Sequence, residues 1–221
     1  MSLLLFLTHF GDPYMTAPLA AAVLGWLAAT GRRRAAIEWG AGMACAVGLV
    51  ALSKFVYAGW GIGIDALQFT GVSGHTMLSA AVYPLVAAIC ARDERVRAAA
   101  WGGLSFALAI GLSRVLLGFH SWSEIVSGGV LGAGVAAMTL RRMRVARGVL
   151  RDAAGPAGDR TAAVPRAAAR SAHARATVCF AAAAFAIVVL SYGRTAPVSA
   201  WISVNAPKMA EWSRVWFDDI R

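Results

Sequence analysis

Six long apolar stretches of the sequence constrain its fold more than any other feature. They cover Tyr14–Thr30, Ala35–Tyr57, His75–Ala91, Ala98–Leu117, Glu124–Leu140 and Ala174–Tyr192. Each has roughly the 17–25 residues that cross a hydrocarbon core about 30 Å thick, and at these lengths only helices satisfy every backbone polar group in lipid. We therefore predict an all-α polytopic membrane protein with about six transmembrane helices that form one helical bundle.

The composition argues against a soluble, nucleic-acid-binding domain. Hydrophobic residues make up 59% of the chain and charged residues 14%, whereas soluble domains carry about 25% charged residues. The net charge of +10 comes from short basic clusters between the apolar stretches, without interleaved aromatic residues. Such clusters are typical of membrane topology, so we expect the chain's partner to be the lipid bilayer, not nucleic acid.

The basic clusters predict the orientation of the bundle. Fifteen of the 21 Lys and Arg residues lie in three alternate connections: 31–34, 92–97 and 141–175. By the positive-inside rule these connections are cytoplasmic. Residues 58–74 and 118–123 contain no Lys or Arg and fall on the opposite side with both termini. In a bacterium this predicts a multi-pass inner-membrane protein with periplasmic termini.

The chain reads as one membrane-integral domain, residues 1–221. Residues 151–173 are rich in Ala, Gly, Pro and Arg, which predicts a flexible cytoplasmic linker. The tail 194–221 carries tryptophans among charges, which predicts an interfacial helix on the periplasmic side. Gly128 and Gly132 form a G-x3-G pair that predicts close helix packing.

Unusual polar residues gather at one end of the predicted spans. Ionisable groups at membrane depth are costly and suggest function. These residues are Lys54, Ser73, Gly74, His75, Arg114, His120 and Glu124. All of them belong to the predicted periplasmic end of the bundle, within a core of about residues 50–140.

The residue types at this end suit phosphoryl transfer. Ser73 is expected to cap the following helix, whose free N–H groups and dipole attract an anion. His120 and Glu124 are spaced i, i+4, so the carboxylate can orient the imidazole and leave its other nitrogen free to attack. Lys54 and Arg114 supply positive charge for a phosphate. This set predicts a phosphohistidine intermediate.

No pattern in the sequence predicts a metal or a cofactor. The carboxylates are not clustered as Mg²⁺ ligands. Cys45, Cys90 and Cys179 are far apart and lack metal-ligand spacing. We therefore expect metal-independent chemistry with no cofactor.

Three motifs resemble those of the type 2 phosphatidic acid phosphatase superfamily, which is also similar to vanadium haloperoxidases. Its motifs are K-x6-R-P, P-S-G-H and S-R-x5-H-x3-D. The matching residues are Lys54, Val72-Ser73-Gly74-His75, Ser113-Arg114, His120 and Glu124. The resemblance implies a metal-independent phosphatase acting on a lipid phosphate or diphosphate.

The resemblance also implies a role for each matching residue. His120 corresponds to the nucleophile, Glu124 to the carboxylate that orients it, and His75 to the acid that protonates the leaving group. The implied phosphate ligands are Lys54, Ser73, Gly74 and Arg114.

The sequence departs from these motifs at three places. Gly61 and Ile62 stand where the first motif has Arg-Pro, Val72 replaces a proline, and Glu124 replaces an aspartate. The missing Arg removes one phosphate cation, which leaves two alternatives open. One is a lipid phosphotransferase of the same family, and the other is a non-catalytic lipid-phosphate binder or transporter component.

Each candidate also has an ordinary structural interpretation. Lys54 and Arg114 can extend from helix ends towards water, and His75 can be a buried structural histidine. His120 with Glu124 can be a helix-packing pair. His9 and Asp12 belong to the same end and are close enough in the predicted topology to approach the site, but the favoured interpretation is that they are ordinary polar positions near the N-terminus.

Overall fold

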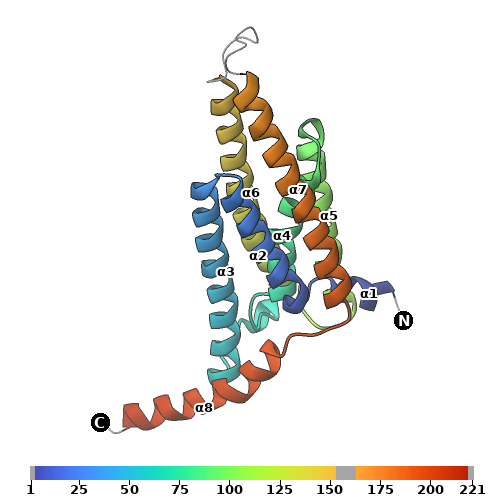
Figure 1. The fold of residues 1–221 in the computed structure, drawn as a ribbon. Helices are drawn as coiled ribbons and strands as arrows, with labels where there is room; N and C mark the ends of the chain where they lie inside the picture. Colours follow the sequence, from blue (N-terminus) through green and yellow to red (C-terminus); the bar gives the residue numbers. More distant parts are fainter. Residues whose placement is uncertain (1–2, 153–162, 219–221) are drawn as a thin grey trace.

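The computed structural model describes the backbone of residues 3–152 and 163–218, and the side chains of residues 3–144 and 171–213. The chain is an all-α membrane protein whose helices are packed as a bundle (Figure 1). In order, the α-helices are α1 (Leu3–His9), α2 (Pro13–Ala29), α3 (Arg33–Trp60), α4 (Gly74–Cys90), α5 (Val96–Leu116), α6 (Trp122–Asp152), α7 (Ala163–Ser191) and α8 (Val198–Asp218). Two short 3-10 helices, η1 (Asp65–Leu67) and η2 (Asp93–Arg95), lie in the connections.

Helices α2 to α7 correspond in order to the six apolar stretches. By length and composition, α3, α5, α6 and α7 contain segments that can cross a membrane. Helices α2 and α4 are apolar but have only 17 residues each. The described residues contain no β-strand, only one isolated bridge between Ile64 and Phe69. The predicted fold class is therefore confirmed.

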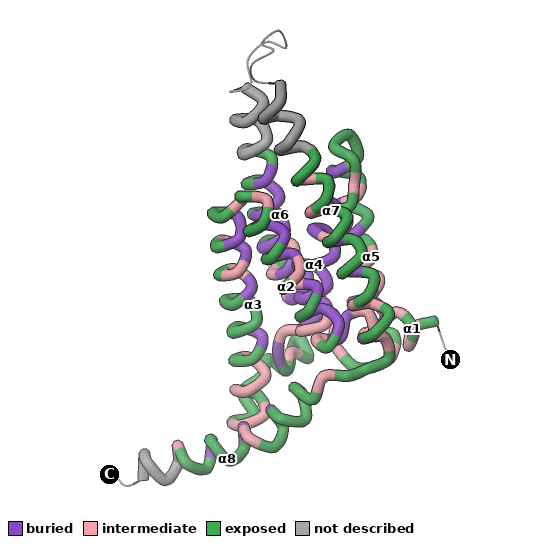
Figure 2. The backbone as a smooth tube through the Cα atoms, in the orientation of Figure 1, coloured by how far each residue is buried: buried purple, intermediate pink, exposed green. Residues whose placement is uncertain are grey.

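Helix α4 is the centre of the bundle. Its residues are buried without interruption from Thr76 to Leu85, and Figure 2 shows this helix almost wholly buried among its neighbours. A helix that is apolar all round needs such a central position. Because α4 begins at Gly74, its first turn carries the Ser-Gly-His motif inside the bundle.

Close backbone packing of α6 on α4 fixes the position of the first turn of α4 relative to α6. A Cβ atom on Gly128 would lie 2.6 Å from the Ser73 carbonyl oxygen, and one on Gly132 would lie 2.2 Å from that of Met77. Only glycine permits this approach. The predicted role of the G-x3-G pair in helix packing is confirmed, and it brings α6 against the start of α4.

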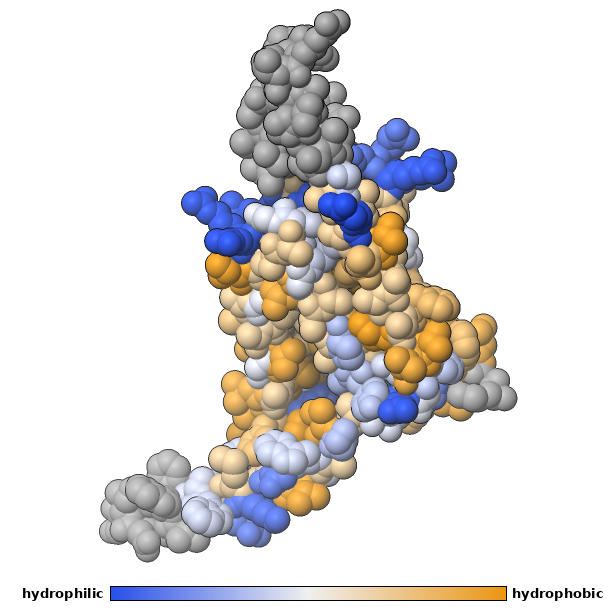
Figure 3. Space-filling view, in the orientation of Figure 1, coloured by the Kyte–Doolittle hydropathy of each residue, from blue (hydrophilic) through white to orange (hydrophobic). Residues whose placement is uncertain are grey.

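The two ends of the bundle differ in character. Hydrophilic side chains gather at the end where α2 joins α3 and α4 joins α5, and apolar side chains cover the middle (Figure 3). Helices α1 and α8 lie at the opposite end (Figure 1). Helix α8 packs on the end of α3 through Ile202, Ala206 and Ala210. The tail is thus helical, as expected.

Two boundaries of the predicted linker need correction. Helix α6 continues to Asp152, and α7 begins at Ala163, so residues 163–173 are helical. Alanine and arginine are both good helix formers, and they dominate this segment. Residues 153–162, the rest of the expected linker, lie outside the described residues.

Candidate active site

His120 and Glu124 make the shortest polar contact between the predicted site residues. The Nδ1 atom of His120 lies 2.6 Å from Oε2 of Glu124. His120 precedes α6, which begins at Trp122, so the pair bridges a connection and the first turn of a helix. The side chains are 11% and 3% exposed, respectively. A carboxylate accepting from Nδ1–H leaves the lone pair on Nε2 available for attack.

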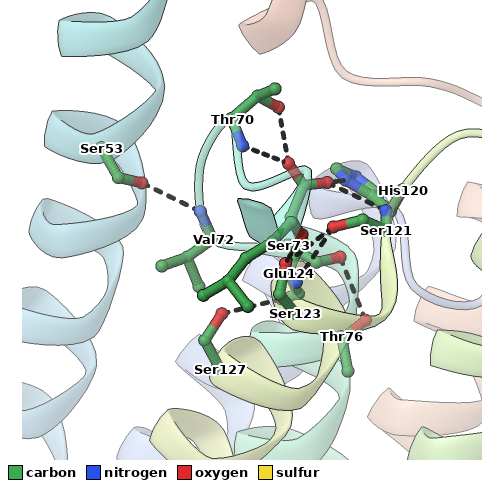
Figure 4. Close-up of polar contacts among 11 residues, drawn as sticks. Ser53, Thr70, Val72, Ser73, Thr76, His120, Ser121, Ser123, Glu124 and Ser127 are labelled. Atoms are coloured by element: carbon green, nitrogen blue, oxygen red, sulfur yellow. Dashed lines mark hydrogen bonds and ion pairs between the residues drawn. The ribbon is translucent and has the colours of Figure 1, made fainter. Parts of the chain in front are cut away.

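The Glu124 carboxylate is itself held by several donors. Its Oε1 accepts from the backbone N–H of Thr70 at 2.7 Å and from the Thr70 hydroxyl at 2.5 Å. The backbone N–H of Ser121 lies 3.3 Å from Oε2. Figure 4 shows Glu124 between Thr70 and His120. The orientation of His120 therefore depends on the loop before α4 as well as on α6.

The surroundings of His120 favour the neutral imidazole. Burial lowers the pKa of His120 below its ordinary value, while the hydrogen bond with Glu124 raises it. The positive charges of Lys54 and Arg114 lower the pKa further, and the net direction is downwards. A neutral imidazole at physiological pH is the form that can act as a nucleophile.

The loop before α4 is joined to its neighbours by backbone hydrogen bonds. The Ser73 N–H donates to the Glu124 carbonyl at 3.0 Å, and the Val72 N–H donates to the Ser53 hydroxyl at 3.0 Å. The expected side-chain cap by Ser73 is absent. Its hydroxyl lies instead 3.0 Å from the Thr76 hydroxyl, because Ser73 is fully buried beneath α6.

Lys54 shares a cavity with His120. The cavity has a volume of about 150 Å³, and Thr70 and Gly71 line it from the loop before α4. Its remaining wall includes Ser199, Ile202 and Ser203 of α8. The tail therefore covers this cavity, a contact that the sequence analysis did not predict.

Arg114 lies near the end of α5, close to the N-terminal segment. Its Nη1 donates to the Thr8 hydroxyl at 3.3 Å, and its guanidinium carbon lies 4.5 Å from the centre of the Phe119 ring. The Nε atom is buried and has no hydrogen-bond partner among the described residues. A buried guanidinium donor without an acceptor suits an oxyanion.

The position of the first motif's arginine is taken by a helix terminus. Gly61 follows α3 directly and has a φ of 69°, a left-handed conformation that favours glycine at the end of a helix. Trp60, Asp65 and Gln68, the polar or aromatic residues nearest to Gly61 in the sequence before Ser73, do not replace this arginine in the cavity of Lys54 and His120, because none of them lines it. Among the described residues that line this cavity, Lys54 is the one Lys or Arg.

Asp12 lies beside His75, an approach to the site that the sequence left open but did not favour. Its Oδ2 lies 3.7 Å from Nε2 of His75, an ion pair when His75 is protonated. Its Oδ1 accepts from the backbone N–H groups of Tyr14 at 2.7 Å and Ala196 at 2.9 Å. Asp12 is 5% exposed, so the interpretation as an ordinary polar position is wrong. The Asp-Pro pair indicates a helix start, but no local signal indicates the contact with His75.

Ligands for a bound metal ion do not gather in the described part of the chain. No three His, Cys, Asp or Glu side chains there lie close enough to hold one. Each of the two histidines of the site lies instead beside one carboxylate, Glu124 at 2.6 Å from His120 and Asp12 at 3.7 Å from His75. Metal independence stays a prediction.

Sequence comparisons relate this chain to a protein family and to a bacterial relative. The PAP2 superfamily profile matches residues 14–147. A Klebsiella pneumoniae protein described as an uncharacterized 22.5 kDa protein in the cps region is 34% identical over 138 residues. That match spans 61% of this chain and 66% of the relative, slightly less than two thirds of its length. No solved structure matches the chain.

The superfamily profile includes every residue predicted from the motifs, from Lys54 to Glu124. Membership of this superfamily supports phosphatase-type activity on phosphate esters. Because the match covers more than half of the sequence, the chain belongs to the PAP2 superfamily.

Proposed function

We propose that the protein is a metal-independent phosphatase that hydrolyses a lipid phosphate or diphosphate through a phosphohistidine on His120. One observation carries the proposal: the 2.6 Å contact between His120 and Glu124 at the wall of a cavity that also contains Lys54. A buried imidazole oriented by a carboxylate beside a cation has the parts needed for nucleophilic attack on phosphorus.

In the first step, Nε2 of His120 attacks the phosphorus and forms an N–P bond. The bond from phosphorus to the leaving oxygen breaks, and His75 gives that oxygen a proton. The phosphorylated imidazole becomes cationic, and the Glu124 carboxylate at Nδ1 stabilises it. Lys54, Arg114 and the N–H groups at the start of α4 stabilise the charge of the transferring group.

In the second step, water hydrolyses the intermediate. His75, now neutral, takes a proton from the water as its oxygen bonds to phosphorus and the N–P bond breaks. Phosphate leaves, and both histidines return to their starting protonation states. Asp12, 3.7 Å from His75, is placed to stabilise the protonated form that this cycle needs at its start.

A lipid substrate is supported by the apolar groove beside the site. Helices α5 and α6 enclose a hollow of about 590 Å³ whose lining is almost entirely apolar and includes Leu108, Trp122 and Val126. Thr76, which contacts Ser73, belongs to the same lining. Hydrocarbon chains can lie in this groove within the bilayer while the phosphate reaches the start of α4.

The proposed location is the bacterial inner membrane, with the site on the periplasmic face and both termini in the periplasm. The positive-inside rule supports this orientation. The basic connections 31–34 and 92–97 belong to one end of the bundle, while α1 and α8 lie at the other (Figures 1 and 3), where α4 and α6 begin with the site residues. The substrate would then be a lipid of the outer leaflet.

One observation favours a second candidate, a lipid-phosphate binder without turnover. Gly61 stands in place of the first motif's arginine, so Lys54 is the cation that lines the described part of the cavity. The loss of one phosphate ligand can cost about 3–4 kcal/mol of transition-state stabilisation. Within the family, transfer of the phosphoryl group to a second lipid instead of water remains the other alternative.

Phosphate release separates these functions. Purified protein in detergent with EDTA is incubated with a panel of lipid phosphates and diphosphates, beside the His120→Asn variant. Release by the wild-type protein alone supports the phosphatase. Labelled donor phosphate that appears in a second lipid identifies a transferase. Binding of lipid phosphate with neither product identifies a binder and contradicts the proposal.

A further inference from the structure

A second hollow lies towards the basic end of the bundle, away from the candidate active site. It has a volume of about 210 Å³ and lies between α5 and α6, with Pro84 of α4 at its floor. Its lining is rich in small side chains: Ala100, Ala133, Ala136 and Ala137. Trp101 lines it as well and is 67% exposed. Small residues leave a gap between the two helices that is open on the outside of the bundle.

Three arginines line the same hollow: Arg97 from α5, and Arg141 and Arg144 from α6. No carboxylate lines it. In the described part of the chain, none of the three makes an ion pair or a side-chain hydrogen bond. Arg142, by contrast, donates to Glu38 at 2.8 Å. The hollow therefore combines an apolar floor with three positive charges to which no described side chain supplies a counter-charge.

We propose that this hollow binds an anionic phospholipid of the leaflet on the basic side. The phosphate would contact Arg97, Arg141 and Arg144, whose planar guanidinium groups suit phosphate oxygens. The upper part of an acyl chain would lie against the alanine-lined floor. Basic pockets between membrane helices favour anionic head groups in this way, whereas a soluble anion would leave the apolar floor unused.

The site is distinct from the cavity that contains Lys54 and His120, because the two share no lining residue. It does adjoin the groove proposed for substrate chains, with which it shares Leu104 and Ala133. The acyl chain of a lipid whose phosphate contacts the arginines would thus lie along the same α5–α6 surface. The proposal rests on the charges and the hollow and does not depend on catalysis.

Trp101 provides a direct probe of occupancy. The protein is placed in nanodiscs that contain either brominated phosphatidylglycerol or brominated phosphatidylcholine, and tryptophan quenching is measured. The contribution of Trp101 is the difference between the wild-type protein and Trp101→Phe. Phosphatidylglycerol should quench Trp101 at a lower mole fraction than phosphatidylcholine, by at least about tenfold for three basic contacts.

Two matched triple variants test the role of the arginines. R97Q/R141Q/R144Q should abolish the preference for phosphatidylglycerol. R33Q/R34Q/R92Q removes the same charge from exposed positions at the same end and should retain it. An equal loss in both variants would show general surface attraction and overturn the proposal. Equal quenching by the two lipids in the wild-type protein would also overturn it, without needing either variant.

Discussion

The Nδ1 atom of His120 lies 2.6 Å from Oε2 of Glu124, although the two residues belong to different local structures. His120 is in the connection after α5, and Glu124 is in the first turn of α6. Thr70 contacts the other oxygen of the same carboxylate. One buried carboxylate thereby holds the proposed nucleophile and the loop that leads to His75.

The pH dependence of phosphate release should report on this contact. Burial lowers the pKa of His120 below its ordinary value, and the hydrogen bond with Glu124 offsets part of this lowering. Below its pKa the imidazole is protonated and cannot attack, so activity should fall as pH decreases through that value. Glu124→Gln removes the raising contribution, so the acid limb of kcat/KM should move to lower pH.

Glu124→Gln should also reduce kcat by about 100-fold or more, because an amide has only one oxygen to accept from both Thr70 and His120. The comparison uses one substrate throughout, so the titration of its phosphate cancels. An acid limb that stays in place, or moves to higher pH, would contradict the assigned hydrogen bond.

Lys54 should contribute to binding of the phosphate in the cavity that it shares with His120. Lys54→Gln removes one charge-assisted contact, so kcat/KM should fall by about 10- to 100-fold. The chain offers a matched control, because its other lysine is Lys208 on α8, which is exposed. Steady-state kinetics of Lys208→Gln should match the wild-type protein. Equal effects of the two changes would contradict a local role for Lys54.

Asp12 should act on the leaving group through His75. In Asp12→Asn, departure of a lipid alkoxide, which needs a proton, should slow by about tenfold. Release from a nitrophenyl phosphate, whose leaving group needs little protonation, should change much less. Rates for the two substrates are measured on the same preparation. An equal reduction for both would indicate that Asp12 only supports the fold through Tyr14 and Ala196.

Packing of α6 on α4 should be sensitive to a single methyl group. A Cβ at position 132 would lie 2.2 Å from the Met77 carbonyl oxygen, so Gly132→Ala should destabilise the protein by about 1–3 kcal/mol. Gly134, on the same helix, has nothing within 4 Å of the corresponding position. Gly134→Ala should therefore be neutral or stabilising, by up to about 1 kcal/mol. Thermal unfolding in detergent compares them, and equal losses would contradict the close approach.

Local patterns predicted the helices well because membrane spans are encoded by length and hydropathy. They also indicated which end of the bundle carries Lys54, His75 and His120. The i, i+4 spacing suggested the contact of His120 with Glu124, even though His120 is not helical. These features depend on neighbours in the sequence or on the position of a residue within its span.

Contacts between distant segments could not be predicted in this way. Asp12 meets His75 because the turn between α1 and α2 packs against α4. Ser199 reaches the cavity of Lys54 because α8 packs across the end of α3. Neither contact has a periodic signal. The prediction that the Ser73 side chain caps α4 was wrong, because Ser73 is buried under α6 and its hydroxyl lies beside that of Thr76. The early start of α7 was missed because the composition of residues 163–173 suits a helix as well as a linker.

The most direct test of the account is whether phosphate becomes bonded to His120. The protein is incubated with a lipid phosphate carrying labelled phosphorus, quenched in alkali and digested, and the label is mapped. If His120 is the nucleophile, an acid-labile, alkali-stable label is expected on His120 and absent from His120→Asn, which should also release no phosphate. A label on another residue, or full phosphate release by His120→Asn, would contradict the proposed mechanism.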